Sequence, residues 1–298
     1  MRQGRASRTA EHNALFRALE TRGRVDCRLI DDPLAATFLS PGFAFVVRAA
    51  RVPAVRAAVL RYIDDRWPGV RTAVVARTRL IDDGIATILA DGGGAPGLTI
   101  GQVVVLGAGF DTRPYRLPGL AARAVFEVDH PDTQRRKRAR LRRHDVDCDH
   151  VRFAPTDFTD GSPGAALAAV GFDPAVPTLV LWEGVTNYLD ADAVDATLKW
   201  CATTAPGSHV IFTYVDRRLL DDPTAFAGAE RMLATIRRAG ESMTFGLDPD
   251  ELAPYLRERG LDLVSDLGAR TFRRRYYGPR ADRMAGHEFY RVVHARIP

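Results

Sequence analysis

The first hundred residues carry apolar residues at the spacing of helices. In TAEHNALFRALETR the apolar residues Ala14, Leu15, Ala18 and Leu19 recur every three or four positions, which places them on one face of a helix. Further helices are predicted in DDPLAATFL, where Asp-Asp-Pro suits a helix start, in VPAVRAAVLRYIDDRW and in VRTAVVARTRLIDDGIATILAD. The stretch GGGAPG, residues 92–97, predicts a flexible turn that ends this segment.

Beyond this turn, short apolar and β-branched runs alternate with helical stretches. This alternation predicts a mostly parallel, doubly wound sheet with helices on its faces, which is a Rossmann-like α/β fold. We expect the last strand to run antiparallel to its neighbours, at an edge. The predicted strands are 102–106, 124–128, 151–156, 178–182, 209–215, 262–266 and 288–297. The helices predicted between them are 114–120, 131–143, 164–170, 191–204 and 249–259.

These patterns divide the chain into two parts of one structural unit. Residues 1–97 are predicted to form an N-terminal helical cap, and residues 98–298 the sheet domain that binds the ligand. Residues 217–250 follow the fifth strand as an insertion, and we expect them to act as a lid.

Composition and charge narrow the class of protein. With 298 residues, 46% hydrophobic and 27% charged, the chain has the balance of a soluble globular protein. The polar N-terminus has no apolar signal region, and no apolar run is long enough to span a bilayer, so we expect a cytoplasmic protein. Cys27, Cys148 and Cys201 are far apart and odd in number, which indicates reduced thiols. The net charge of +5 is weak evidence for nucleic-acid binding by itself.

The stretch VVVLGAGFDTRPYRL joins a predicted strand to a glycine turn. Gly107, Ala108 and Gly109 allow the backbone to approach a ligand at the carboxyl end of the strand. In a dinucleotide site Thr112 would be a third glycine, and Asp111 would lie beside the pyrophosphate and repel it. S-adenosylmethionine has no phosphate, and its amino and sulfonium groups are positive. The turn therefore favours this cofactor over NAD.

Acidic residues also follow the next strands of the predicted sheet. Glu127 and Asp129 flank the end of the second strand, where an acid accepts hydrogen bonds from ribose hydroxyls. Asp157 follows the third strand, placed to accept from the adenine amino group, with Phe158 as an apolar or backbone contact. Glu183 follows the fourth strand, where an acid is better explained by a ligand than by surface polarity. Each acid alone also suits a helix cap or a loop, but acids at four successive strand ends indicate a binding site.

Four stretches together resemble a known family. VARTRLIDDGI, VVVLGAGFDTRPYRL, VFEVDHP and LWEGVTNYL, in this order, are similar to the leucine carboxyl methyltransferase-like family of S-adenosylmethionine-dependent methyltransferases. The resemblance extends to about residue 216 and is to the bacterial branch, many of whose members methylate small metabolites. It implies a Rossmann-like sheet with added helices that cap the pocket.

The resemblance also implies roles for individual residues. Tyr188 matches a tyrosine near the substrate carboxylate. An arginine at position 77 suits the bidentate binding of a carboxylate. The implied cofactor contacts are Arg77 to the methionine carboxylate, Gly107 through its backbone, Asp129 to ribose, Asp157 and Phe158 to adenine, and Glu183 to the methionine amino group.

We therefore expect O-methylation of a carboxylate or hydroxyl of a small metabolite, in bacterial secondary metabolism. Arg77 and Tyr188 would orient the acceptor, with Tyr214 as a further substrate contact. A carboxylate is already ionised at pH 7, whereas a phenol or alcohol needs a base. His130, Tyr188 and Tyr214 are the candidates for that base, although Asp-His-Pro is also a good helix entry.

Several alternatives remain open. The acceptor can instead be a protein C-terminal carboxylate, or a nucleic acid bound by the basic helix at residues 135–144. We prefer to interpret that helix as a solvated surface, and HDVDCDH, residues 144–150, as a solvated turn and not a metal site. A non-catalytic cofactor-binding protein and a nicotinamide-dependent reductase fit less well. We expect a small-molecule acceptor as the partner, with no membrane, nucleic acid or metal.

Overall fold

A computed structural model describes residues 8–91, 98–158, 162–238, 240–284 and 286–298, so the turn predicted at 92–97 lies outside the described residues. The strands are β1 (Gln102–Leu106), β2 (Ala124–Asp129), β3 (Val151–Pro155), β4 (Thr178–Trp182), β5 (His209–Val215), β6 (Asp262–Gly268) and β7 (Tyr290–Arg296). The α-helices are α1 (Arg8–Thr21), α2 (Pro41–Ala49), α3 (Pro53–Arg66), α4 (Val70–Asp91), α5 (Arg113–Arg116), α6 (Pro118–Ala121), α7 (Pro131–Arg143), α8 (Gly164–Ala168), α9 (Ala191–Cys201), α10 (Arg218–Asp221), α11 (Ala229–Arg238), α12 (Leu252–Arg257) and α13 (Ala269–Tyr277). The 3-10 helices are η1 (Ala35–Phe38), η4 (Thr186–Tyr188), η5 (Pro223–Ala225) and η6 (Gly278–Arg283).

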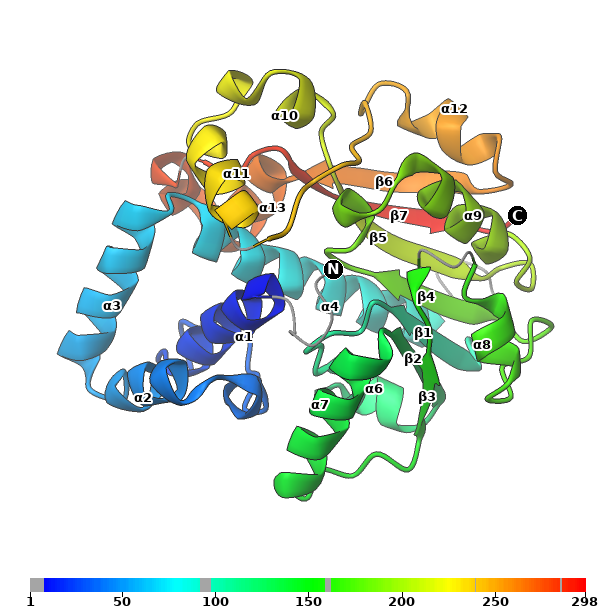
Figure 1. Ribbon diagram of the computed structural model, residues 1–298, viewed down its shortest axis with the longest axis horizontal. Coiled ribbons are helices and arrows are strands. Elements are labelled where there is room, and N and C mark those ends of the chain that lie inside the picture. The colour runs from blue at the N-terminus through cyan, green and yellow to red at the C-terminus, as the bar shows by residue number, and fades with distance from the viewer. Residues whose placement is uncertain (1–7, 92–97, 159–161, 239, 285) are drawn as a thin grey trace.

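The strands form one seven-stranded sheet in the order β3-β2-β1-β4-β5-β7-β6 (Figure 1). The first five strands are parallel, and β7 is antiparallel to both β5 and β6. The predicted Rossmann-like α/β fold is confirmed, as are the bounds of β1, β4 and β5. The prediction that the last strand lies at an edge is wrong. The edge strand on that side of the sheet is β6, because the chain returns after β6 through α13 and places β7 between β5 and β6.

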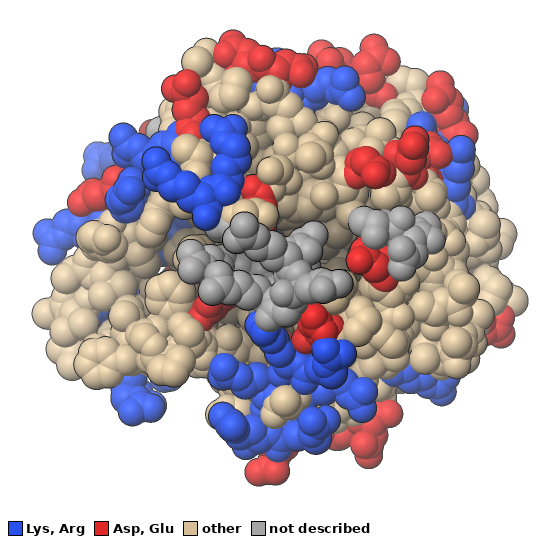
Figure 2. Space-filling view, in the orientation of Figure 1, with Lys and Arg blue, Asp and Glu red and all other residues tan. Residues whose placement is uncertain are grey.

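Basic side chains gather over α7, at the bottom of the view in Figure 2. Part of this charge is structural. The Lys137 ammonium is buried and lies 2.8 Å from the Glu127 carboxylate. Arg140 donates a hydrogen bond of 2.9 Å to the carbonyl of Thr37. The basic segment 135–144 therefore holds neighbouring elements as well as facing solvent.

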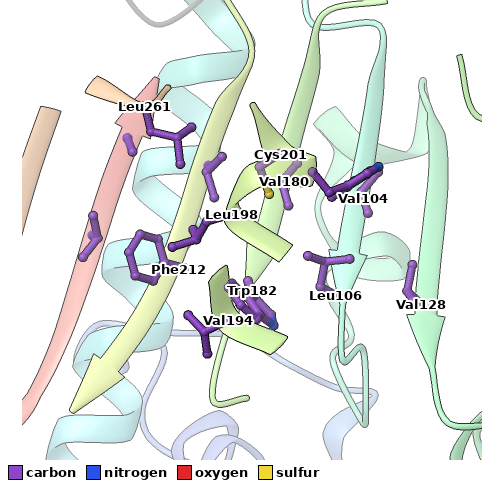
Figure 3. Packing of buried hydrophobic residues seen from close by; sticks show 14 of the residues in the cluster. Val104, Leu106, Val128, Val180, Trp182, Val194, Leu198, Cys201, Phe212 and Leu261 are labelled. Atoms are coloured by element: carbon purple, nitrogen blue, oxygen red, sulfur yellow. The ribbon is translucent and has the colours of Figure 1, made fainter. Parts of the chain in front are cut away.

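Two apolar clusters cover the two faces of the sheet. On one face, Val180, Trp182 and Phe212 pack against residues of α9 such as Leu198, as Figure 3 shows. On the other face, residues of α4, α6 and α13 pack against β1, β4 and β5. Strand residues alternate between the two clusters, which is the expected pattern for a sheet covered on both sides.

A third cluster joins the N-terminal helices. Figure 1 shows α1, α2 and α3 beside the sheet, with α10 and α11 above them in the view. The apolar residues of α1, α2 and α3 pack with Phe110 of the glycine turn. The Phe110 ring stacks on the ring of Phe38, with 5.1 Å between the ring centres. Most of α4, however, packs on the sheet and not over the N-terminal cluster. Of the segment 1–97, α1 to α3 form this cluster and α4 mainly covers the sheet, and the predicted division into a helical cap and a sheet domain stays a prediction.

Some predicted helices are shorter or broken. The helix predicted at 114–120 is two single turns, α5 and α6, because Pro118 has no N–H to continue the first turn. DDPLAATFL forms only the 3-10 helix η1, and Asp32 from this stretch is buried against Arg17. The helix predicted at 249–259 is limited to α12. None of the described helices is both long and apolar enough to cross a bilayer.

Candidate active site

Three of the predicted cofactor residues lie in one row at the carboxyl edge of the sheet. The register of β1 with β2 and with β4 places Gly107 and Glu183 just beyond the ends of β1 and β4, in line with Asp129, the last residue of β2. The strand order reverses between β1 and β4, and ligands of open α/β sheets bind at such a switch point. The candidate cofactor site is therefore the edge formed by these three residues.

The glycine turn is required by the local backbone. Gly107 has φ of +63° and Gly109 has φ of +41°, a region that disfavours residues with a Cβ. A Cβ atom on Gly107 would lie 2.3 Å from Cγ2 of Val185. Gly107 thus lets the backbone after β1 approach the segment after β4 closely.

The two acids of β2 have different surroundings. Asp129 accepts hydrogen bonds from the backbone N–H groups of Gly109 and His130, at the mouth of the turn. Burial raises the pKa of Asp129, although these backbone hydrogen bonds oppose the rise. Glu127 is fully buried under α7 and pairs with Lys137, so its predicted contact with a ribose does not fit its position. Asp129 is the acid that the structure leaves at the strand end.

Glu183 is held by two arginines. Its Oε1 accepts from Nε of Arg77 at 2.7 Å, and its Oε2 accepts from Nη1 of Arg113 at 2.7 Å. Burial opposes ionisation of Glu183, but the positive charges of Arg113 and Arg77 outweigh it and lower its pKa. The carboxylate is therefore charged at neutral pH, as a contact to a positive ligand group requires.

Arg113 is a central residue that the sequence analysis missed. It is 3% exposed, and Nε donates to Asp82 while Nη1 also donates to Asp111, both at 2.7 Å. The backbone N–H of Arg113 binds the other oxygen of Asp111 at 2.8 Å. Its only signal in the sequence is its position two residues after the acid of the turn.

These contacts change the reasoning about Asp111. Burial opposes ionisation of Asp111, but Arg113 outweighs that effect and holds its pKa well below the ordinary value. The carboxylate is charged, yet the adjacent guanidinium neutralises much of its field. The predicted repulsion of a pyrophosphate by Asp111 is therefore weaker than the sequence suggested.

Asp157 and Phe158 lie directly after β3, next to β2 in the sheet. The Asp157 side chain is half-buried, whereas Phe158 is buried in the cluster beneath α8 and α9. Their predicted contacts with adenine stay a prediction.

A cavity of about 620 Å³ lies between the N-terminal helices and α11, and we call it the acceptor cavity. Arg77 lines it and also bonds Glu183, so one side chain joins the cavity to the strand ends. In Figure 1, α11 lies above α1 and α2 in the view, and all three contribute lining residues. The lining residues are Thr9, His12, Asn13, Leu15, Phe16, Phe43, Val46, Ala58, Val59, Tyr62, Ile63, Trp67, Val70, Val74, Arg77, Tyr188, Met232, Thr235, Ile236, Met243, His287 and Tyr290.

Tyr188 and Tyr290 supply polar groups to this cavity beside Arg77. Burial and the neighbouring Tyr290 raise the pKa of the Tyr188 hydroxyl, so it is neutral at physiological pH. The Arg77 guanidinium lies over the ring of Tyr290, 4.7 Å from its centre. The site therefore offers a cation and neutral hydroxyls to an acceptor.

Two predicted residues lie elsewhere. His130 is the N-cap of α7, where its Nδ1 accepts from the backbone N–H of Asp132 at 3.2 Å, and it does not line the acceptor cavity. Tyr214 is buried in β5 and donates to Asp266 of β6 at 2.9 Å. Neither residue lines the acceptor cavity, so the structure gives no support for His130 as a catalytic base or for Tyr214 as a substrate contact, and both roles stay predictions. The His130 ring caps α7, and the Tyr214 hydroxyl donates its hydrogen bond to β6.

No group of three His, Cys, Asp or Glu side chains among the described residues is arranged to hold a metal ion. The segment 144–150 forms turns ahead of β3.

The residues at the strand ends fit S-adenosylmethionine. Asp129 and the ionised Glu183 provide acceptors for hydroxyl and ammonium groups, and Arg77 provides a donor for a carboxylate. Gly184, directly after Glu183, has φ of +73°, and a Cβ added there would meet nothing within 4 Å. The donor set and the open backbone beside it suit an amino acid joined to a nucleoside.

Comparison with known proteins agrees with this fit. Residues 10–202 match the family model described as leucine carboxyl methyltransferase. A Streptomyces avermitilis protein whose name places it among the S-adenosyl-L-methionine-dependent methyltransferases is 36% identical over 216 residues, covering 72% of this chain and 70% of the relative. A Frankia alni protein named in the same way is 32% identical over 270 residues, covering 86% of this chain and 81% of the relative.

Solved structures support the fold. A DUF574 family protein from Streptomyces avermitilis has a TM-score of 0.60 at 14% identity, covering 95% of this chain and 97% of that one. A structure from Thermobifida fusca, described as a methyltransferase, has a TM-score of 0.57 at 18% identity, covering 82% of this chain and 88% of that one. The chain therefore belongs to the leucine carboxyl methyltransferase family, and it is a methyltransferase whose cofactor is S-adenosyl-L-methionine.

Proposed function

We propose that the protein methylates a carboxylate oxygen of a small, largely apolar molecule bound in the acceptor cavity. The observation that carries this proposal is the position of Arg77, which lines the cavity and bonds Glu183 at the end of β4. An acceptor carboxylate beside Arg77 therefore lies next to the row of cofactor residues. Among the described lining residues none is Asp or Glu, so the cavity favours an anionic acceptor.

The surroundings of the cavity favour a carboxylate over a phenol or an alcohol. S-adenosylmethionine, when bound, supplies an electrophilic methyl group on a sulfonium. An ionised carboxylate attacks such a group directly, whereas a hydroxyl must first lose its proton. Tyr188 is unsuited to take that proton because its hydroxyl is itself neutral. Arg77 and Tyr188 would instead orient the acceptor carboxylate and keep it in line with the methyl group.

The size and walls of the cavity favour a small molecule over a protein tail or a nucleic acid. Helices α1, α2, α3, α4 and α11 all contribute lining residues, so a substrate is surrounded on several sides. Lys137 and Arg140 of the basic helix are engaged within the protein, which leaves that helix a weak candidate for nucleic-acid binding. The place of the product in secondary metabolism stays a prediction.

The test uses S-adenosylmethionine that carries a labelled methyl group. The purified protein is incubated with pairs of compounds of matched skeleton, one a carboxylic acid and the other a phenol or alcohol. Release of S-adenosylhomocysteine measures turnover, and mild alkali distinguishes the products, because methyl esters release labelled methanol and methyl ethers do not. We expect alkali-labile label with the carboxylic acids and no label with the phenols or alcohols. Alkali-stable label would contradict the proposal, and label in peptides ending in a free carboxylate but in no small acid would favour the protein substrate.

A further inference from the structure

A second cavity of about 590 Å³ lies against the acceptor cavity. Both are lined by Trp67, Val70, Met232 and His287, so these side chains form the wall between them. The second cavity also carries Arg66, Arg231 and Glu230. Of these four side chains, Trp67 offers only an N–H donor, whereas His287 offers both a donor and a nitrogen acceptor.

The backbone fixes His287 in an unusual conformation. His287 has φ of +60°, which is uncommon for a residue with a Cβ, and Gly286 before it has φ of +100°. A Cβ atom on Gly286 would lie 2.5 Å from the carbonyl oxygen of Pro68. The chain is thus pressed against the segment after α3, and this contact turns His287 towards the wall. Conformations of this kind persist where the surroundings impose them, often at binding sites.

The ring of His287 packs against two aromatic rings. It stacks on Tyr290 at 5.2 Å with an angle of 13°, and Phe289 meets it edge-on at 4.7 Å. No residue in the described part of the chain hydrogen-bonds its ring nitrogens. Burial, reinforced by Arg77 and Arg273, lowers its pKa to about 3, so the ring is neutral at pH 7. A neutral imidazole offers one donor and one acceptor, which matches a hydroxyl group.

His287 and Arg77 both contact the ring of Tyr290. Arg77 lies over Tyr290 at 4.7 Å, and His287 stacks on that ring. Arg77, Tyr290 and His287 all line the acceptor cavity, so a single molecule with its carboxylate at Arg77 has His287 within the same cavity. The nearby guanidinium groups disfavour a cation at this point, and Trp67 and Met232 surround it with apolar surface.

We propose that His287 determines acceptor specificity by hydrogen-bonding a hydroxyl group that the acceptor carries away from its carboxylate. This inference rests on the proposed function, since it assumes a carboxylate at Arg77. It assigns the acceptor to the hydroxylated carboxylic acids with an apolar, ring-sized or chain-like body. His287 is a positioning residue here, because the hydroxyl that it binds is not the methylated group.

The test compares cinnamate with 4-hydroxycinnamate, which differ only in a distal hydroxyl. Calorimetry measures the affinity of each for protein saturated with S-adenosylhomocysteine. We expect the wild type to bind the hydroxylated probe roughly tenfold more tightly, the effect of one buried hydrogen bond. His287→Gly, which accepts the positive φ, should abolish this preference. His287→Asn, which accepts the same φ and retains a donor and an acceptor, should keep part of it. His144→Gly, the same change at the exposed end of α7, should keep all of it.

The ratio of the two affinities separates a specific contact from general damage, because a disturbed fold weakens both probes alike. An unchanged ratio in His287→Gly would overturn the inference and leave the proposed function standing. Equal affinities in the wild type would overturn it in the same way. Failure of both probes to bind a wild type that binds S-adenosylhomocysteine would overturn the carboxylate site itself, and the role of His287 with it.

Discussion

Nε of Arg77 donates a hydrogen bond of 2.7 Å to Oε1 of Glu183, a residue 106 positions later in the chain. Arg77 comes from α4 and lines the acceptor cavity, whereas Glu183 follows β4 at the cofactor edge. The pair is 4% and 20% exposed at its side chains, so solvent screens it little. The pair joins the acceptor cavity to the candidate cofactor edge.

Removing Arg77 should weaken cofactor binding and stop turnover. Arg77→Ala takes away a charged donor for a carboxylate, and we expect S-adenosylhomocysteine to bind about 10 to 100 times more weakly by calorimetry. Arg79→Ala is the control on the same helix, because its ion pair with Asp83 is 43% exposed at the arginine and should matter little. Full cofactor affinity in Arg77→Ala, with turnover lost, would assign the residue to the acceptor alone.

Substitution of Asp129 should weaken cofactor binding, whereas substitution of Glu127 should leave it nearly unchanged. Asp129→Ala removes the acceptor at the end of β2, and we expect S-adenosylhomocysteine affinity to fall by about tenfold or more. Glu127→Gln keeps the shape of a side chain buried under α7 and should leave that affinity nearly unchanged. The opposite order of effects in the two variants would restore Glu127 as the ribose contact.

The buried pair of Lys137 and Glu127 should be worth much more to stability than an exposed pair. Lys137→Met leaves the Glu127 carboxylate buried without its cation, at a cost of about 3–5 kcal/mol in the free energy of unfolding by urea titration. Lys199→Met is the matched control, because Lys199 pairs with Asp195 at 2.7 Å but is 63% exposed. Equal losses in the two variants would show that burial does not govern the Lys137 pair.

Tyr188→Phe should lower turnover without adding or removing a step in its pH profile. Burial raises the pKa of this hydroxyl, so it stays protonated well above pH 9 and serves as a donor. We expect kcat to fall roughly tenfold with the best carboxylate of the test panel, at unchanged S-adenosylhomocysteine affinity. If the variant lost an ionisation between pH 6 and 9 that the wild type shows, Tyr188 would be acting as a base.

The paired histidines of β5 and β7 should make stability depend on pH. Nδ1 of His209 lies 2.9 Å from Nε2 of His294, and burial, with His209, lowers the pKa of His294 from 6.5 to about 4. The unfolded chain therefore binds the extra proton between these values, so stability rises with pH from about 4 to 6.5 and then levels off. We expect His294→Gln to remove up to roughly 3 kcal/mol of this rise, measured by urea titration across the window. A variant curve parallel to that of the wild type would contradict this assignment.

The sequence by itself determined the parallel strands of the sheet and the edge where the candidate cofactor residues gather. The bounds of β1, β4 and β5 follow from short apolar runs, because a strand covered on both faces must be apolar at nearly every position. The glycine turn and the acids at the strand ends follow from chain order, since parallel strands bring their carboxyl ends to one edge. Asp129 and Glu183 could therefore be named before any contact was known.

Tertiary structure decided what each charged group faces. Glu127 and Asp129 are two residues apart and look alike in the sequence, but only the packing of α7 shows that one is paired inside the protein. Arg113 follows the acid of the turn by two residues, but its partners Asp82 and Glu183 come from distant elements. His287 stacks on the nearby Tyr290, but its place beside two cavities depends on helices far away in the chain. The place of β7 inside the sheet was likewise settled by its pairing with β6. Local patterns report which faces must be buried, whereas the partners of a buried charge depend on which distant elements meet there.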